Sequence, residues 1–264
     1  MTESLNIVKQ GASFKDKFTL FTYFLRIPSI LLKSLATGKD LRALEDKQKF
    51  LKRDVTLKNR YGVFFCGRNI FTVYTASEGY EKHLFPFIEM ASGVFIDVGA
   101  HVGRYTVALG NRRDVIVLAI EPEQYNFSML KKNIELNHLV NITAINEGAY
   151  SSSGTIPFFR ADLGEGMHSV FEQTKDATQI SVDTLDNMVE KTNLVGQVKK
   201  IKIDAEGAEV EILKGAKKIL EKDHPTMMVE IWQKNAANLS CILDLLAPYH
   251  YSVQQLDHDN YLFF

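Results

Sequence analysis

The strongest structural signal in the chain is the segment Phe95-Ile96-Asp97-Val98-Gly99-Ala100-His101-Val102-Gly103. Residues 94–98 form a short apolar run, which is typical of a buried strand, and residues 105–110 have a helical pattern. Gly99 permits a tight turn between the two, and Gly103 permits close packing of the helix against the strand. A strand, a glycine turn and a helix in this order predict an α/β sheet.

The alternation of strands and helices continues after this segment. It predicts strands at residues 115–120, 142–147, 198–203 and 227–231, and helices at 124–137, 209–220 and 236–246. Such an alternation predicts a parallel sheet with helices on both faces. At the end of the chain, residues 251–256 and 261–264 flank a segment too short for a helix, so they predict a hairpin with an antiparallel last strand. A terminal antiparallel strand is similar to the sheet of methyltransferases that use S-adenosylmethionine (SAM), whereas a dinucleotide-binding Rossmann sheet is usually parallel throughout.

The residues before this sheet follow a different pattern. Residues 14–35 predict one or two helices with a break at Pro28, and residues 40–56 predict a charged helix. Residues 62–66 and 70–74 flank the turn signal Gly67-Arg68-Asn69 and predict a hairpin, and residues 81–90 predict a short helix. We therefore divide the chain into a helical, basic N-terminal segment, residues 1–60, and an α/β domain, residues 61–264.

Charge divides the chain in the same place. Residues 1–60 hold 13 Lys/Arg and 6 Asp/Glu, a net charge of +7, while the other 204 residues hold 18 and 26, a net charge of −8, which together give −1. The simpler interpretation of the basic segment is a solvated helical face, and the alternative is peripheral contact with an anionic membrane or an anionic substrate. The total charge argues neither for nor against nucleic acid, and no nucleic-acid partner is expected.

The sequence predicts neither a membrane span nor a metal site. The apolar run at residues 18–25 is broken by Arg26 and Pro28, and a spanning helix needs about 20 mostly apolar residues. Cys66 and Cys241 lie far apart and outside any CxxC or Cys/His cluster, so neither zinc nor a disulfide framework is expected. A cytoplasmic location is the simplest interpretation, with the peripheral membrane contact as its variant.

The glycine turn favours SAM over a dinucleotide. Its spacing is G-x-x-x-G rather than the dinucleotide fingerprint G-x-G-x-x-G. A buried carboxylate at Asp97 would repel a pyrophosphate, but it suits the ammonium and sulfonium groups of SAM, whose own carboxylate can still use the helix N-terminus. The simpler interpretation of the motif is a generic α/β turn.

Carboxylates follow two further predicted strands. Glu121 comes directly after residues 115–120 and lies 18 residues beyond Gly103, where a carboxylate can accept hydrogen bonds from both hydroxyls of a ribose. Asp204 and Glu206 follow the strand at residues 198–203. Ligands bind at the carboxyl ends of such strands, so we expect these side chains at one crevice. Glu206 and Glu209 have the alternative role of capping the next helix.

Four segments give the chain a specific resemblance to the FkbM family of SAM-dependent methyltransferases. They are FIDVGAHVGRY (95–105), residues 120–122, EGAYSSSGTIPF (147–158) and IKIDAEGAEVEILKG (201–215). Thr184-Leu185-Asp186, Pro225 and Glu230-Ile231 also fit the family, and the resemblance covers residues 60–264. His101 departs from it, because the family commonly has Asn there.

The resemblance implies a class I methyltransferase fold, which is a Rossmann-like sheet, with SAM as the cofactor. It also implies O-methylation of a hydroxyl on a sugar, glycan or other small metabolite. It assigns the cofactor loop to Asp97, Gly99, Ala100, His101 and Gly103, the ribose side to Glu121 and Pro122, adenine to Gly148 and Ala149, and the methionine part to Asp204.

Catalysis needs a group that positions the acceptor hydroxyl or takes its proton. Asp204 is the first candidate for this catalytic role, and Glu206 and His168 are the second candidates. His168 lies in residues 160–179, a polar segment that is either a lid that excludes water or a plain surface loop. Residues 77–81 are another candidate cover for the cofactor.

Two other classes of function remain open. A nicotinamide-dependent oxidoreductase needs a phosphate-tolerant loop, and Asp97 argues against one. A catalytically silent, methyltransferase-like binding protein has no need of the full set Asp97, Glu121 and Asp204, so the presence of that set argues against it.

Overall fold

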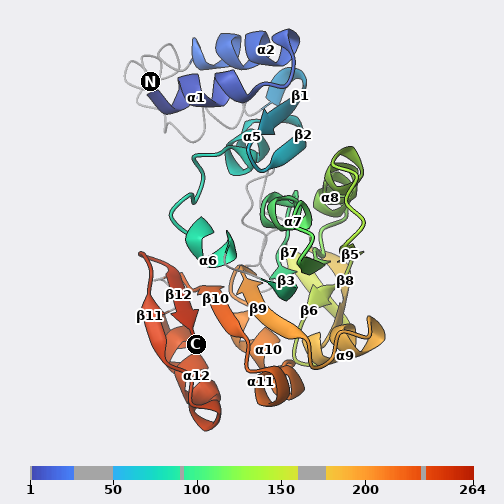
Figure 1. Ribbon diagram of the computed structural model, residues 1–264, viewed down its shortest axis with the longest axis vertical. Helices are drawn as coiled ribbons and strands as arrows, with labels where there is room; N and C mark the ends of the chain where they lie inside the picture. The colour runs from blue at the N-terminus through green and yellow to red at the C-terminus, as the bar shows by residue number, and fades with distance from the viewer. Residues whose placement is uncertain (1, 27–49, 90–91, 160–176, 233–235) are drawn as a thin grey trace.

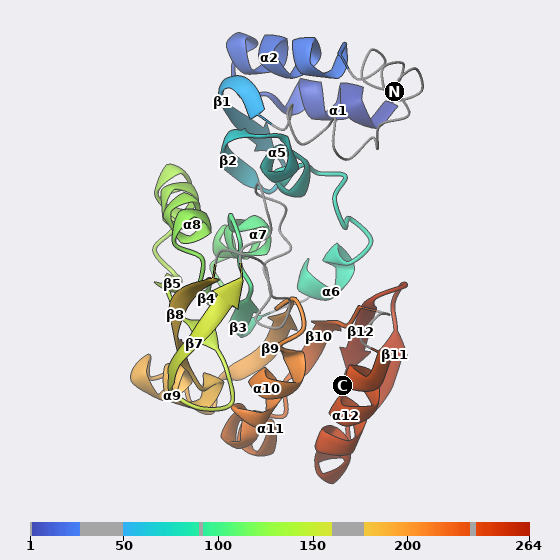
Figure 2. The same ribbon diagram turned by 180° about the vertical axis from the view of Figure 1, so that it is seen from behind.

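The central element is a sheet with the strand order β11-β12-β10-β9-β3-β4-β5 (Figures 1 and 2). The computed structural model describes residues 2–26, 50–89, 92–159, 177–232 and 236–264. The strands are β3 (Gly93–Val98), β4 (Val115–Ile120), β5 (Ile142–Ile145), β9 (Val198–Ile203), β10 (Thr226–Glu230), β11 (Val253–Gln255) and β12 (Asn260–Phe263). Within this sheet the neighbouring strands β10, β9, β3, β4 and β5 run parallel, and β12 runs antiparallel to both β10 and β11. The predicted α/β class and its terminal antiparallel hairpin are therefore confirmed.

Helices cover both faces of this sheet. Val94, Ile96 and Val98 pack on one face with α9 (Leu185–Lys191), α10 (Glu209–Lys214), α11 (Lys217–Asp223) and α12 (Ala236–Leu246). Phe95 packs on the other face with α6 (Phe85–Glu89), α7 (Arg104–Gly110) and α8 (Gln124–Leu136). Because side chains of a strand alternate between faces, β3 is buried on both sides, as its continuous apolar run predicts.

The N-terminal segment forms a separate layer at the end of the molecule opposite α12 (Figure 1). Here α1 (Thr2–Gln10) and α2 (Phe14–Phe24) contact β1 (Phe50–Asn59), which pairs antiparallel with β2 (Gly62–Asn69). None of the described helices is long and apolar enough to cross a membrane. The division that the sequence suggests at residue 60 falls in the turn between β1 and β2.

Two asparagines tie this layer to the central sheet. Asn133 of α8 accepts a hydrogen bond through Oδ1 from the backbone N–H of Phe65 at 2.7 Å, and Asn137, the C-cap residue of the helix, accepts one from the N–H of Val63 at 2.8 Å. These bonds satisfy backbone groups of β2, which would otherwise form an open strand edge. Asn133 also donates to the carbonyl of Val102, at 2.8 Å, so the same side chain holds the glycine turn.

Two predictions for the N-terminal layer are wrong. Residues 50–56 belong to strand β1 and not to the predicted charged helix, because Leu51, Val55 and Leu57 are buried at the alternating spacing of a strand. The rest of that predicted helix lies within residues 27–49, outside the described residues. Residues 70–74 belong to helix α5 (Ile70–Ala76) and not to a hairpin. The side chain of Asn69 caps that helix by accepting a hydrogen bond from the Phe71 N–H at 2.9 Å.

The single helix predicted at residues 209–220 is also wrong, since α10 and α11 are separate helices. At the break, a Cβ on Gly215 would lie 2.1 Å from the carbonyl oxygen of Tyr150, so the two chain segments touch backbone to backbone. Asp186 then caps α11, because its carboxylate accepts hydrogen bonds from the N–H groups of Lys218 at 2.9 Å and Ile219 at 3.0 Å.

A small second sheet was not predicted. Its order is β6-β8-β7, with β6 at Gly148–Ala149, β7 at Gly154–Phe159 and β8 at Ala177–Asp183. Residues 160–176, most of the predicted lid, lie outside the described residues, and residues 177–179 belong to β8. This sheet lies beside the carboxyl ends of the central strands and forms one wall of the site.

Candidate active site

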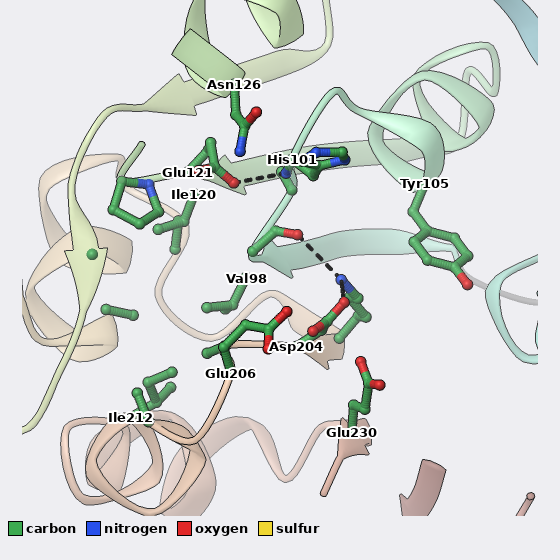
Figure 3. Close-up of a pocket in the computed structure, with 18 of the residues that line it drawn as sticks. Val98, His101, Tyr105, Ile120, Glu121, Asn126, Asp204, Glu206, Ile212 and Glu230 are labelled. Atoms are coloured by element: carbon green, nitrogen blue, oxygen red, sulfur yellow. Dashed lines mark hydrogen bonds and ion pairs between the residues drawn. The ribbon is translucent and has the colours of Figure 1, made fainter. Parts of the chain in front are cut away.

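A cavity of about 270 Å³ opens at the carboxyl ends of β3, β4 and β9 (Figure 3). Ligands of open α/β sheets bind at this edge. Nearly all of the predicted site residues line it: Gly99, Ala100, His101, Glu121, Pro122, Gly148, Ala149, Asp204 and Glu206. The structure therefore brings the carboxylates that follow β4 and β9 to one crevice, as expected.

Asp97 and Gly103 are not among the residues that line the cavity, and the cofactor contact expected of them stays a prediction. Asp97 pairs in register with Lys202 of the adjacent strand β9, so the two side chains lie on the same face of the sheet. Its Oδ2 accepts a hydrogen bond from the Thr106 hydroxyl at 2.6 Å, and its Oδ1 lies 3.9 Å from Lys202 Nζ. Gly103 begins α7 with a left-handed φ of 90° and packs closely against Leu130 of α8.

Gly99 sets the distance between two of the loops that form the cavity. Its φ is 75°, and a Cβ at this position would lie 1.9 Å from the carbonyl oxygen of Asp204. Any side chain would thus force the β3 and β9 loops apart, and only glycine accepts both the left-handed backbone and this contact. His101, with φ of 51°, also has a left-handed backbone. Asn and His both tolerate that conformation better than most residues, which gives a physical reason why His can stand where the family has Asn.

Glu121 is buried beside the glycine turn. Its Oε2 accepts a hydrogen bond from the His101 N–H at 2.8 Å (Figure 3), and its Oε1 accepts one from the Glu123 N–H at 2.9 Å. Burial raises the pKa of Glu121 to about 8, although the bond from His101 and the charge of Lys202 act against this. The side chain of Asn126 also hydrogen-bonds to this carboxylate. Three of its four lone-pair positions are therefore used, and one is open to a ligand hydroxyl.

Lys202 is the centre of a charged cluster at the other end of the cavity. Its Nζ donates to Asp204 Oδ2 at 3.1 Å and to the Gly99 carbonyl at 3.2 Å. Burial alone lowers the pKa of Lys202, but the charges of Asp204, Asp97 and Glu81 together raise it above its usual value. The lysine therefore stays charged, and it offsets several carboxylates at once.

Asp204 and Glu230 form a carboxyl pair in which Glu230 holds the proton. The charge of Asp204 and burial raise the pKa of Glu230 to about 10, so Glu230 is neutral at physiological pH and donates to Asp204. Burial opposes ionisation of Asp204, but Lys202 and the hydrogen bond from Glu230 lower its pKa. The indole N–H of Trp232 donates to Glu230 Oε1 at 3.1 Å and helps to orient the pair. Asp204 thus faces the cavity as a carboxylate.

The family model for the methyltransferase FkbM domain matches residues 97–253, which is more than half of the chain. This chain belongs to the FkbM methyltransferase family. The resemblance seen in the sequence is confirmed, and the matched residues include Asp97, the glycine turn, Glu121 and the cluster around Asp204.

Three related proteins illustrate how far the likeness extends. Methyltransferase sdnD of Sordaria araneosa is 24% identical over 193 residues, which are 59% of this chain and 73% of that protein. The hexuronic acid methyltransferase AglP of Haloferax volcanii is 30% identical over 132 residues, 48% of this chain and 52% of that protein. The crystal structure of Methyltransferase FkbM from Methylobacillus flagellatus KT has 17% identity and a TM-score of 0.49, and the match covers 100% of this chain and 58% of that one. The chain thus spans little more than half the length of AglP and of the crystallised FkbM protein.

The loop at residues 77–81 forms part of the cavity wall, because Tyr80 and Glu81 line the cavity. Arg104 holds the loop in place by donating hydrogen bonds to the backbone carbonyls of Ser77 and Tyr80. The Tyr105 hydroxyl donates to Glu81 Oε2 at 2.5 Å. Burial raises the pKa of Glu81, and the charge of Asp204 raises it further. The predicted cover is therefore fixed to α7 and adds a further carboxyl group to the cluster.

Glu206 and Glu209 take different positions in the same loop. Glu206 lines the cavity. Glu209 is buried, and its Oε1 accepts a hydrogen bond from the Gly207 N–H at 2.8 Å. The N-cap of α10 is Ala208, and no side chain caps the helix, so neither glutamate has the capping role. His168 lies outside the described residues, and its catalytic role stays a prediction.

Sequence reasoning missed Lys202, Arg104, Tyr105 and Trp232 as site residues and mentioned Glu230 only as part of the resemblance. A signal for Lys202 was present, because it lies between Ile201 and Ile203 in a strand predicted to be buried. A buried cation requires a charged partner, and the acidic residues that follow this strand supply one. The other residues had no local signal, since their roles depend on contacts between distant segments.

Proposed function

We propose that this protein is a SAM-dependent methyltransferase that methylates a hydroxyl oxygen of a sugar, glycan or other small metabolite. The observation that carries the proposal is the arrangement of one cavity, with the buried Glu121 at one end and the cluster of Asp204, Lys202 and Glu230 at the other (Figure 3). SAM has hydroxyl donors on its ribose at one end and an ammonium group at the other.

The residues present fit SAM along its whole length. Glu121 has an open acceptor position for a ribose hydroxyl. Ala149 lies next to the apolar wall formed by Ile156, Phe158, Ile180 and Val182, which suits adenine. The ionised Asp204 suits the ammonium group. The name of AglP refers to a hexuronic acid, which supports a sugar as the class of acceptor.

The proposed mechanism needs no covalent enzyme intermediate, because SAM supplies an already activated methyl group. Asp204 orients the acceptor hydroxyl and receives its proton. A carboxylate with a lowered pKa can do this, because the hydroxyl proton becomes strongly acidic as the new C–O bond forms. The loop at residues 77–81, held by Arg104, limits the access of water and helps to fix the acceptor. Glu206 is the second candidate for the proton acceptor.

The proposal is tested by calorimetry of the full chain with SAM, S-adenosylhomocysteine and NAD, followed by an assay of S-adenosylhomocysteine release with a panel of hexuronic acid glycosides. Binding of SAM and its product, but not of NAD, together with release that depends on an acceptor, is the expected result. Binding of NAD alone would instead favour the oxidoreductase. Binding of SAM with no release for any acceptor would favour the silent binding protein.

Replacing Glu121 by alanine should weaken SAM binding by about 1–3 kcal/mol, because a ribose hydroxyl loses its buried acceptor. Calorimetry measures the change, with Glu135→Ala as the control, since Glu135 is an exposed carboxylate farther along α8. Equal affinity for the two variants would show that Glu121 does not bind the ribose.

The raised pKa of Glu121 predicts that adenosine binding depends on pH. The ionised carboxylate accepts hydrogen bonds more strongly than the neutral acid, and its pKa is about 8, so affinity should rise with pH. We expect an increase of about tenfold between about pH 6.5 and about pH 8.5. Lys202 and Asp204, whose charges act on Glu121, keep their charge in this range because the pKa of Lys202 is raised and that of Asp204 is lowered.

The ligand for this measurement is 5′-methylthioadenosine, which lacks the titrating amino group of SAM. Binding to the Glu121→Gln variant should be independent of pH over the same range. A pH profile in that variant that matches the wild type would assign the titration to another group.

A further inference from the structure

Helix α2 has one face that is firmly attached to the protein. Its first turn is closed by a capping box in which the Ser13 side chain accepts from the Asp16 N–H at 3.1 Å and the Ser13 N–H donates to Asp16 Oδ2 at 2.9 Å. Asp16 Oδ1 also accepts a hydrogen bond from Arg53 of β1 at 2.6 Å, and Leu20 is fully buried. The orientation of the helix is therefore fixed, and so is the direction of its opposite face.

The opposite face is an apolar stripe exposed to solvent. Phe14, Phe18, Phe21 and Leu25 are exposed by 83%, 59%, 44% and 62%, and their spacing of four, three and four residues puts them on one side of the helix. The rings of Phe14 and Phe18 are stacked with centroids 6.4 Å apart. Among the described residues, the only other exposed phenylalanine is the C-terminal Phe264. Exposed aromatic residues gathered in this way indicate a contact surface.

Basic side chains flank the stripe. Lys15 and Lys17 are exposed and lie on opposite sides of it at 100° per residue, and the exposed Arg26 follows its last member. Residues 1–60 carry a net charge of +7, from 13 Lys/Arg against 6 Asp/Glu. A second copy of the chain would bring an equally basic face against this one, so charge favours an anionic partner.

We propose that the apolar stripe of α2 docks on an anionic membrane surface. The helix lies in the plane of the interface, with Phe14, Phe18, Phe21 and Leu25 in the boundary of the acyl chains. Lys15, Lys17 and Arg26 extend along the sides of the helix to the lipid phosphates, as long basic side chains do at interfaces. The layer of α1 and α2 forms one end of the molecule, so the central sheet remains clear of the membrane (Figures 1 and 2). The proposal is independent of the methyltransferase activity.

The test is co-sedimentation of the full chain with vesicles of phosphatidylcholine containing about 30 mol% phosphatidylserine, and with vesicles of phosphatidylcholine alone. The wild type should bind the anionic vesicles at least about tenfold more tightly, and its binding should weaken as salt rises. The Phe14→Ser/Phe18→Ser double variant should lose at least about tenfold in affinity. Its control is Val140→Ser/Val253→Ser, which removes two exposed apolar side chains elsewhere and should bind like the wild type.

A charge-reversal pair separates the electrostatic contribution. Lys15→Glu/Lys17→Glu should lose the preference for anionic vesicles, whereas Lys217→Glu/Lys222→Glu, with the same charge change on the exposed side of α11, should keep most of it. Because the altered residues are exposed, thermal unfolding of all variants should match the wild type.

A separate measurement reports insertion directly. In a Phe18→Trp variant, brominated lipids should quench the new tryptophan, after subtraction of the signal from Trp232 in the parent protein. Absence of quenching, or equal binding by the wild type and the Phe14→Ser/Phe18→Ser variant, would overturn the proposal. A third result would also overturn it: the wild type does not bind vesicles but forms a dimer in sedimentation analysis, and the Phe14→Ser/Phe18→Ser variant is monomeric. The stripe would then be a contact between copies of the chain.

Discussion

Replacing Asp204 by asparagine should lower kcat for methyl transfer at least about tenfold while the fold survives, and it should also weaken SAM binding, because the ammonium group loses a carboxylate. Asparagine keeps the shape of the side chain but cannot accept the hydroxyl proton. Asp204 directly follows the core strand β9, and its carboxylate is hydrogen-bonded by both Lys202 and Glu230, which fixes its position. Loss of a proton acceptor in such a site costs about 10²–10⁴-fold, and tenfold is the lower limit because Glu206 can partly replace it.

Steady-state release of S-adenosylhomocysteine with an acceptor found in the panel measures this effect. Glu190→Gln is the control, because Glu190 is an exposed carboxylate on α9 far from the cavity lining. A loss confined to kcat would support a role in the chemical step, whereas a loss confined to KM would indicate a role in acceptor binding only. Wild-type turnover in Asp204→Asn, with a loss in His168→Ala, would move the base to residues 160–179.

The central sheet was predictable because its signals are local. The bounds of β4 and β9 agree with the prediction. β4 is a short apolar run, β9 has Val198, Ile201 and Ile203 among lysines, and each strand is followed by an acidic residue. The turn at Gly99 was predictable for the same reason, because a left-handed backbone and a close contact both require glycine. Burial on both faces leaves few alternatives for such segments.

The N-terminal layer was harder to predict because tertiary contacts override local preference there. The β-branched and aromatic residues of α5 favour a strand, yet the cap at Asn69 and packing make them helical. The charged residues of β1 suggest a helix, but Arg53 is held by Asp16 of α2, a partner that no local pattern reveals.

The cluster at the site was only half predictable. Asp204 and Glu121 were found because they follow strands that end at one edge of the sheet. The neutral state of Glu230 and the link from Asp97 to Lys202 depend on which strands are neighbours, and strand order does not follow from sequence order. The cofactor contact of Asp97 stays a prediction, and the structure adds what the sequence could not show, that Asp97 lies beside the lysine whose charge lowers the pKa of Asp204.

Replacing Lys202 by methionine should lower the free energy of unfolding by about 3–5 kcal/mol near neutral pH, because buried carboxylates lose the cation that they share. Asp204 lies 3.1 Å and Asp97 lies 3.9 Å from Lys202 Nζ, and the charge of Glu81 acts on it as well. Methionine has a similar length and keeps most of the packing, so the loss reports charge and not volume.

The loss should depend on pH. Without Lys202, burial and mutual repulsion raise the pKa of Asp97 and Asp204 in the folded state above their values in the unfolded chain. A carboxyl group with a raised folded pKa costs nothing below its unfolded pKa and destabilises the fold increasingly as pH rises toward the folded value. The deficit of the variant should therefore be smaller at about pH 5 than at about pH 8.

Urea unfolding at the two pH values measures the deficit, and Lys200→Met is the matched control. Lys200 lies on the same strand and is partly buried, but its Nζ donates to the Phe87 backbone carbonyl and not to a carboxylate. Its replacement should cost much less and should show little dependence on pH, because it leaves no buried charge unpaired. Equal losses in the two variants at both pH values would mean that the cost comes from the removed side chain itself, and Lys202 would then have no role in setting the charge of Asp204.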